Sequence, residues 1–105
     1  MYARTTRILA ARDRIDAGVR QFRETVAEFH GLDGFAGGQF LVDRRSGRVV
    51  ATTFWQTEAA MNASDAHAEV ARLRAAETWG ATVSPSVERY EVAYTELRPS
   101  ASGEA

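Results

Sequence analysis

The sequence of 105 residues lacks cysteine and lysine, and it contains only two prolines and two tryptophans. Without cysteine, the chain forms no disulfide, no thiolate nucleophile and no thiolate metal site. Thirteen arginines nearly balance fourteen acidic residues, so the net charge of -1 gives no electrostatic footprint for nucleic acid or an anionic membrane. No apolar run approaches membrane-spanning length, and the charged N-terminus is unlike a signal peptide. We therefore expect a cytoplasmic protein.

The first half of the chain predicts a strand, a helix and a hairpin. β-Branched and aromatic residues predict a strand over residues 2–10. The next helix is expected to begin after Asp13 as N-cap and to carry one apolar stripe of Ile15, Val19, Phe22, Val26 and Phe29. A strand over residues 34–43 contains Gly37-Gly38, where we expect a bulge. A polar turn joins it to a strand that ends at Trp55.

Two helical pieces are expected after this hairpin. Thr57 is a candidate N-cap for a short helix that extends to Ala63. Ser64 or Asp65 then starts a longer helix that ends at Trp79. The expected inner face of the longer helix consists of Ala66, Val70, Leu73 and Ala76.

The resulting order is strand, helix, strand, strand, helix, strand, which is that of the ferredoxin-like α+β fold. The last strand is expected from Val87 to Leu97, after the breaker Ser84-Pro85-Ser86. Residues 1–97 thus form one domain with a four-stranded antiparallel sheet and both helices on one face. Residues 98–105 are expected to be a disordered polar tail.

The sheet face without helices is expected to be apolar. Side chains alternate along a strand, so the apolar strand residues cannot all point toward the helices. These residues are Phe40, Val42, Val49, Ala51, Tyr90, Val92 and Tyr94. Because an exposed apolar face of this size is usually an interface, we expect a homodimer through the open sheet face.

The chain resembles the antibiotic biosynthesis monooxygenase domain. The resemblance rests on the order of elements, the motif Gly34-Phe35-x-Gly37, the hairpin turn from Asp43 to Gly47 and the segment Phe54-Trp55-Gln56-Thr57-Glu58-Ala59-Ala60. It implies a dimeric α+β barrel with a pocket between the sheet and the second helical segment. Members of the family include cofactor-independent oxygenases of aromatic polyketides, quinol oxygenases and haem-degrading enzymes.

Only some of the family's site residues match. Trp55 corresponds to the pocket tryptophan of the polyketide oxygenases, and Arg74 lies near the place of their pocket arginine. Their asparagine falls on Ala51 and their tyrosine on Met61. The haem-degrading branch has an asparagine on the first strand, a second tryptophan where this chain has Ser64, and an iron-ligating histidine near the position of Arg74. These differences disfavour haem degradation.

Each candidate residue has a functional and a structural interpretation. His67 is either a base for proton transfer or a histidine at the rim of the helix, and Trp55 either stacks on a planar substrate or fills the core. Asn62 is a turn former or a substrate contact. Met61, Leu73 and Trp79 either line the pocket or fill it. Arg74 would stabilise a substrate anion.

Three arginines on the predicted strands also have two interpretations. Arg4, Arg7 and Arg89 lie on strands that pair in this fold. One of them could point into the pocket and bind an enolate or carboxylate. We favour ion pairs across the strands with Glu88 or Glu91.

The leading hypothesis is a monooxygenase without a cofactor that acts on a planar phenolic, quinol or polyketide-like molecule. In such chemistry the deprotonated substrate itself reduces O2, in a dry pocket that offers an oxyanion-stabilising donor. The alternative is a dimer that binds an apolar or aromatic small molecule without turnover, or a structural dimer. A third interpretation is a haem or flavin binder. The sequence shows no metal-ligand cluster and no phosphate-binding glycine loop.

Overall fold

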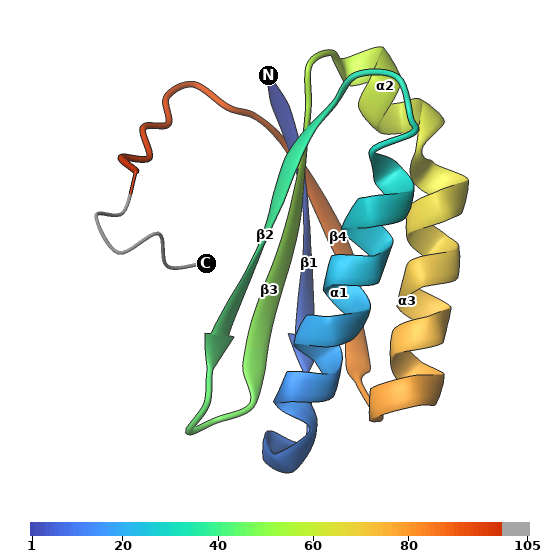
Figure 1. The fold of residues 1–105 in the computed structure, drawn as a ribbon, viewed down its shortest axis with the longest axis vertical. Coiled ribbons are helices and arrows are strands. Elements are labelled where there is room, and N and C mark those ends of the chain that lie inside the picture. Colours follow the sequence, from blue (N-terminus) through green and yellow to red (C-terminus); the bar gives the residue numbers. More distant parts are fainter. Residues whose placement is uncertain (100–105) are drawn as a thin grey trace.

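One antiparallel sheet carries all the helices on one face (Figure 1). The computed structural model describes residues 1–99, apart from the side chains of residues 83–86. The elements are β1 (Tyr2–Leu9), a 3-10 turn η1 (Arg12–Arg14), α1 (Ile15–Phe29), β2 (Phe35–Asp43), β3 (Arg48–Trp55), α2 (Glu58–Ala63), α3 (Asp65–Trp79) and β4 (Thr82–Glu91). The strand order is β2-β3-β1-β4. The ferredoxin-like α+β fold expected from the sequence is confirmed.

The local signals around the hairpin are also confirmed. The pairing of β2 with β3 shifts between Phe35 and Gly37, and Gly37 has a φ of 145°, so the bulge lies where the glycine pair predicted it. Gly38 lies against α1, because a Cβ there would be 3.1 Å from Val26 and 3.2 Å from Phe22. Thr57 caps α2 by accepting a hydrogen bond of 3.0 Å from the backbone N–H of Ala60.

Two expected boundaries are wrong. Asp13 lies inside η1 rather than at an N-cap, and α1 begins without a side-chain cap. The last strand begins at Thr82 and ends at Glu91, so it does not reach Leu97. The backbone of residues 84–86 forms a bulge, since Val83 pairs with Ile8 and Val87 with Thr6. A proline can lie at a bulge of an edge strand, which is why this segment interrupts the ladder without ending it.

The predicted inner face of α3 is wrong as well. Val70 and Leu73 are 52% and 63% exposed. The residues that face the sheet and α1 are instead Ala68, Arg72, Ala75 and Trp79, at helical spacings of four, three and four. Small alanines let α3 approach its neighbours closely, which a stripe of larger side chains would prevent. The larger apolar residues therefore lie on the solvent side.

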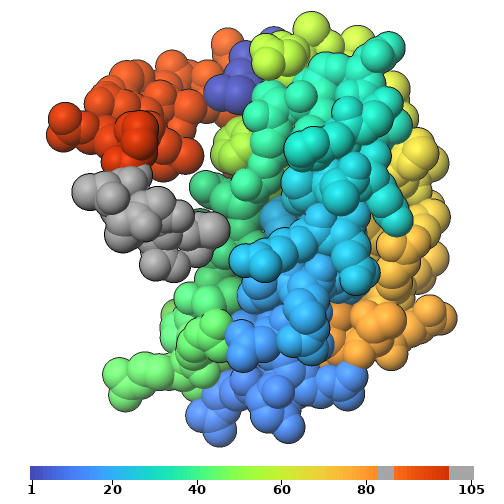
Figure 2. Space-filling model, viewed as in Figure 1, coloured from blue at the N-terminus to red at the C-terminus, as the bar shows by residue number. Residues whose placement is uncertain are grey.

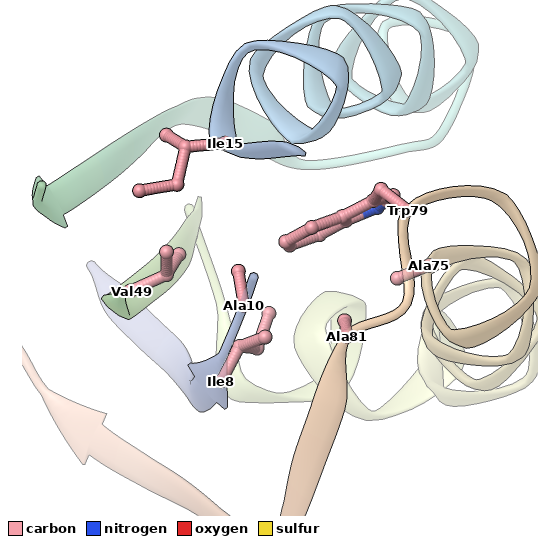
Figure 3. Packing of buried hydrophobic residues seen from close by; sticks show 7 residues of the cluster. All are labelled: Ile8, Ala10, Ile15, Val49, Ala75, Trp79 and Ala81. Atoms are coloured by element: carbon pink, nitrogen blue, oxygen red, sulfur yellow. The ribbon is translucent and has the colours of Figure 1, made fainter. Parts of the chain in front are cut away.

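The core consists of two clusters of buried side chains. Figure 3 shows the first, which joins β1, β3, α1 and the end of α3 through Ile8, Ala10, Ile15, Val49, Ala75, Trp79 and Ala81. The second consists of Phe29, Trp55 and Met61, at the end of the sheet near α2. Burial of each large side chain contributes about 1.5–3 kcal/mol, so both clusters stabilise the packing of helices on the sheet.

The opposite face of the sheet carries exposed apolar side chains. Leu9 and Leu41 are each 53% exposed there, and Tyr90, one of the residues named for this face from the sequence, is 49% exposed. Of the apolar strand residues named above, Phe40, Val42, Val49 and Ala51 pack on the helix side. The chain after β4 turns away from the domain (Figure 2), and Tyr94 and Leu97 are exposed on it. Residues 100–105 of the predicted tail lie outside the described residues.

No helix in the described part of the chain combines the length and apolarity needed to cross a membrane. The cytoplasmic location stays a prediction.

Candidate functional site

A cavity of about 70 Å³ lies between the sheet and the two long helices, bordered by both core clusters. We call it the Arg4 cavity. Aromatic and small apolar side chains form most of its wall, including Phe22, Phe29, Phe40 and Trp79. The polar side chains that line it are Arg4, Thr6, Gln21, Thr25, Thr53 and Arg72. It is therefore an apolar space with a few polar groups, which is the usual composition of a small-molecule site.

Arg4 has a buried guanidinium group, and some of its hydrogen-bond donors are unused in the described part of the chain. Its side chain is only 3% exposed. Nη2 donates hydrogen bonds to the carbonyl oxygen of Met61, to Ser64 Oγ at 2.7 Å and to Asp65 Oδ1 at 2.7 Å. Nε and Nη1 are buried and find no hydrogen-bond partner among the described residues. Since a guanidinium has five N–H donors and a buried donor without a partner is costly, Arg4 has donors, unused by the described residues, at the edge of the cavity that it lines.

Local structure fixes the position of Arg4. Alternation along β1 directs Arg4 toward the helices, on the same side as Thr6 and Ile8. The break between α2 and α3 presents the oxygens of Met61 and Ser64 to it. The guanidinium carbon lies 5.9 Å from the centre of the Trp55 ring, which is within the range of a cation–π contact.

Two arginines share one carboxylate at this end of the cavity. Asp65 accepts hydrogen bonds from Arg4 at 2.7 Å and from Arg89 at 2.9 Å. Partial burial raises the pKa of Asp65, but the hydrogen bonds from the two arginines outweigh it and hold that pKa below its usual value. Burial lowers the pKa of Arg4 despite its bond to Asp65. Arginine nevertheless stays protonated in proteins, so Arg4 is a cation.

Gln21 organises the other end of the cavity. Its Oε1 accepts a hydrogen bond from the indole N–H of Trp79. Its Nε2 donates to the carbonyl oxygen of Ala71 at 3.3 Å. A side chain from α1 thus binds the last turns of α3, which keeps Trp79 against the cavity.

The described residues that line the cavity include no side chain that could act as a base near neutral pH. None of the described lining residues is a histidine, aspartate or glutamate. Within residues 1–99 there is also no group of three histidine or acidic side chains able to hold a metal ion. The polar groups present can donate hydrogen bonds and stabilise negative charge.

The structure brings only part of the predicted site together. Trp79 lines the cavity. Trp55 and Met61 are completely buried beside it, and the Trp55 indole N–H donates to Thr53 Oγ1 at 3.1 Å, so Trp55 is a core residue that supports Arg4. Asn62, His67 and Leu73 are exposed and do not line the cavity. Arg74 is also outside it and forms an ion pair of 3.4 Å with Glu28. The roles given to these residues stay predictions.

The sequence predicted the partners of the three strand arginines only in part. Arg7 pairs with Glu88 at 3.3 Å, as favoured. Arg4 and Arg89 pair with Asp65 instead, so the other interpretation, an arginine at the pocket, describes Arg4. The polar residues Gln21 and Thr25 and the cationic Arg72 were missed. A signal was present, because Gln21 and Thr25 are four residues apart and lie on the buried face of α1.

A second hollow of about 570 Å³ lies on the open face of the sheet, toward the β2–β3 hairpin. Leu9, Leu41 and Val50 form its apolar part. Its charged side chains are paired, since Arg48 binds Asp43 at 3.1 Å and Arg7 binds Glu88. None of the described residues that line the hollow is a buried cation with unpaired nitrogens like Arg4, so we place the candidate site in the Arg4 cavity.

No protein-family model matches the chain. Among curated proteins, it is 44% identical over 94 residues to uncharacterized protein Rv2557 of Mycobacterium tuberculosis, which covers 89% of this chain and 41% of that protein. It is 38% identical over 94 residues to uncharacterized protein Rv2558 of the same organism, which covers 89% of this chain and 39% of that protein. The chain thus spans about two fifths of the length of these relatives.

Solved structures show the same fold at low identity. A candidate antibiotic biosynthesis monooxygenase from Deinococcus radiodurans matches with a TM-score of 0.68, 16% identity, 93% of this chain and 98% of that chain. SnoaB, a cofactor-independent oxygenase from Streptomyces nogalater, matches with a TM-score of 0.63, 18% identity, and 90% and 94% coverage. The heme-degrader MhuD from Mycobacterium tuberculosis matches with a TM-score of 0.66, 16% identity, and 92% and 100% coverage.

Proposed function

Because this chain has the fold of the antibiotic biosynthesis monooxygenase domain, we propose that it is a monooxygenase without a bound cofactor. Its substrate is a small phenolic or enolisable molecule that binds in the Arg4 cavity. One observation carries the proposal: Arg4 is 3% exposed, and two of its nitrogens lack a partner among the described residues. A buried cation beside an apolar wall suits a molecule that becomes an anion in order to react.

Arg4 would act by stabilising the substrate anion. A hydrogen bond to a charged group contributes about 1.5–3 kcal/mol. Since about 1.4 kcal/mol corresponds to one pKa unit, Arg4 would lower the pKa of a bound phenol or enol by roughly one to two units. This effect would compensate for the lack of a base among the described lining residues. It would also make turnover follow the ionisation of the substrate rather than that of a histidine.

The oxidation needs no co-reactant besides O2. The substrate anion supplies the electrons, and in the overall change R2CH2 + O2 → R2CO + H2O the reacting carbon is oxidised while O2 is reduced. One oxygen atom enters the product and the other leaves as water. Phe22, Phe29 and Phe40 would exclude bulk water from the reacting carbon.

The size of the cavity favours a small substrate. Its volume of about 70 Å³ is well below the roughly 300 Å³ at which ligand pockets usually begin. A homodimer through the open sheet face, which we retain as a proposal, would not enlarge it, because that face is on the other side of the sheet. Exposed Leu9, Leu41 and Tyr90 support the dimer. Sedimentation of the protein and of a Leu41→Glu variant would test it, and a wild-type monomer would refute it.

The second candidate function is binding without turnover. The lack of an acid or base among the described lining residues favours it. Dense packing around Trp55 and Met61 also leaves the region next to Arg4 closed.

Oxygen uptake separates the two candidates. We would measure O2 consumption with single-ring quinols and phenols, and binding of the same compounds by tryptophan fluorescence, since Trp79 lines the cavity. Uptake by the wild type that is lost in Arg4→Met supports the oxygenase. Binding without uptake supports the binding protein. Neither uptake nor binding with any compound would refute both.

A further inference from the structure

The Arg4 cavity has an excess of positive charge. Two of its lining residues, Arg4 and Arg72, are cations, and none of the described lining residues is an acid. Arg4 has Asp65 as its ion-pair partner, but Asp65 is shared with Arg89. These three side chains therefore sum to one positive charge, and Arg72 adds a second.

Arg72 has no compensating partner in the described part of the chain. It is half-buried on the face of α3 that lines the cavity, and no ion pair of the described residues includes it. Its charge is near enough to Arg4 to disfavour protonation of that side chain. Two like charges held together at a buried surface repel each other, and removal of water makes this repulsion stronger. An anion in the cavity would relieve it.

The remaining walls indicate what the anion is attached to. Phe22, Phe29 and Phe40 offer aromatic faces, and Thr6 and Thr53 offer neutral hydroxyl groups that can donate or accept one hydrogen bond. Guanidinium groups match the planar geometry of a carboxylate. The cavity of about 70 Å³ has room for a carboxylate and the first atoms of a ring.

We propose that the ligand of the Arg4 cavity is a small aromatic or enolisable carboxylic acid, whose carboxylate is bound by Arg4 and Arg72 together. This inference rests on the proposed function only in that it concerns the same cavity. It adds that the substrate has a permanent negative charge, which a simple phenol lacks near neutral pH. Arg72 is then a binding residue, whereas the sequence had predicted that Arg74 stabilises a substrate anion.

Benzoate, benzamide and benzyl alcohol test the inference, because they share a ring and differ in charge. We expect the wild-type protein to bind benzoate with a Kd below about 1 mM, and the two neutral compounds at least about tenfold more weakly. Titration calorimetry gives the affinities, and tryptophan fluorescence gives the location. Equal affinity for the three compounds, or no binding of benzoate up to about 10 mM, would overturn the inference.

Variants locate the carboxylate. Arg72→Gln is expected to weaken benzoate binding about tenfold and to leave benzyl alcohol binding unchanged, since loss of one charge-assisted contact affects only the anion. Arg23→Gln on the exposed side of α1 is the matched control and should change neither. A loss of benzoate affinity in Arg74→Gln but not in Arg72→Gln would show that Arg74, and not Arg72, binds the carboxylate. These measurements need no substitution of the buried Arg4.

Failure of this inference and failure of the proposed function are distinguishable. Selective benzoate binding, without O2 uptake in the presence of any phenol or enolisable acid, would support the carboxylate site and refute the oxygenase. O2 uptake with neutral phenols, together with no preference for benzoate over the neutral compounds, would support the oxygenase and refute the carboxylate site.

Discussion

Replacing Arg4 by methionine tests whether this arginine serves binding or stability. Methionine is flexible, apolar and of comparable length, so it can cover Trp55 without a charge. Nη2 has two N–H groups, so the variant loses the equivalent of two charge-assisted hydrogen bonds, about 1.5–3 kcal/mol each, which Asp65, Met61 and Ser64 share. It also avoids the cost of keeping a guanidinium with two unpaired nitrogens out of water, which is several kcal/mol. The stability lost with the hydrogen bonds and the stability gained by removing the buried charge nearly cancel.

We therefore expect Arg4→Met to change the free energy of unfolding by less than about 1 kcal/mol, a shift in Tm of less than about 4–8 °C. Asp65 would not be left as a buried unpaired charge, because its side chain is 46% exposed and Arg89 still pairs with it. Urea denaturation followed by tryptophan fluorescence measures the change. Arg4→Ala is the contrasting variant, because the void it leaves should cost about 2–4 kcal/mol.

A large loss of stability in Arg4→Met would refute this reasoning. If the free energy of unfolding fell by more than about 3 kcal/mol, the range for breaking a buried ion pair, Arg4 would be a structural residue. If stability were retained and benzoate still bound as in the wild type, the unpaired nitrogens would not be ligand donors. Only retained stability with lost binding agrees with a cation that is kept for a ligand.

Three further predictions concern other residues. The two arginine partners of Asp65 hold its pKa below the usual value, so its contribution to the free energy of unfolding is complete above about pH 4 and is lost as the pH falls below that value. The free energy of unfolding should therefore differ less between pH 6 and pH 3 in Asp65→Asn than in the wild type. Gly18→Ala places a Cβ 3.0 Å from two ring carbons of Trp79, and this overpacking should outweigh the helix propensity that alanine gains and lower the Tm in a thermal melt. Haemin should give no Soret shift that depends on His67, because this side chain is exposed and outside the cavity; a shift abolished by His67→Ala would support the haem interpretation.

The fold was predictable because its signals are local. The glycine pair at residues 37–38 and the cap at Thr57 each depend on the geometry of a few neighbouring residues. Such patterns act in the same way in any protein. The order of elements then leaves few topologies, and one of them is the observed sheet.

The site was less predictable because it depends on which side of α3 faces the sheet. Val70 and Leu73 are more apolar than Ala68 and Ala75, so hydropathy alone selects the wrong side. The space between α1 and α3 decides the orientation, and only the packed structure shows it. The same rotation that exposes Leu73 directs Arg72 to the cavity, which is why the sequence suggested a different arginine.

The alternation of β1 separates two surfaces with different roles. Arg4 and Thr6 lie on the helix side and line the cavity, while Arg7 and Leu9 lie on the open side and line the larger hollow there; Ile8 borders both. Because neighbouring residues of a strand point to opposite faces, one strand can serve a ligand site and a subunit interface, and among the described residues of β1 Ile8 is the side chain that borders both. An effect of dimer formation on ligand binding would therefore be transmitted through Ile8 or the backbone of β1. The register of this strand is fixed by pairing on both edges, with β3 and β4, so a partner subunit would bind a surface that is already rigid.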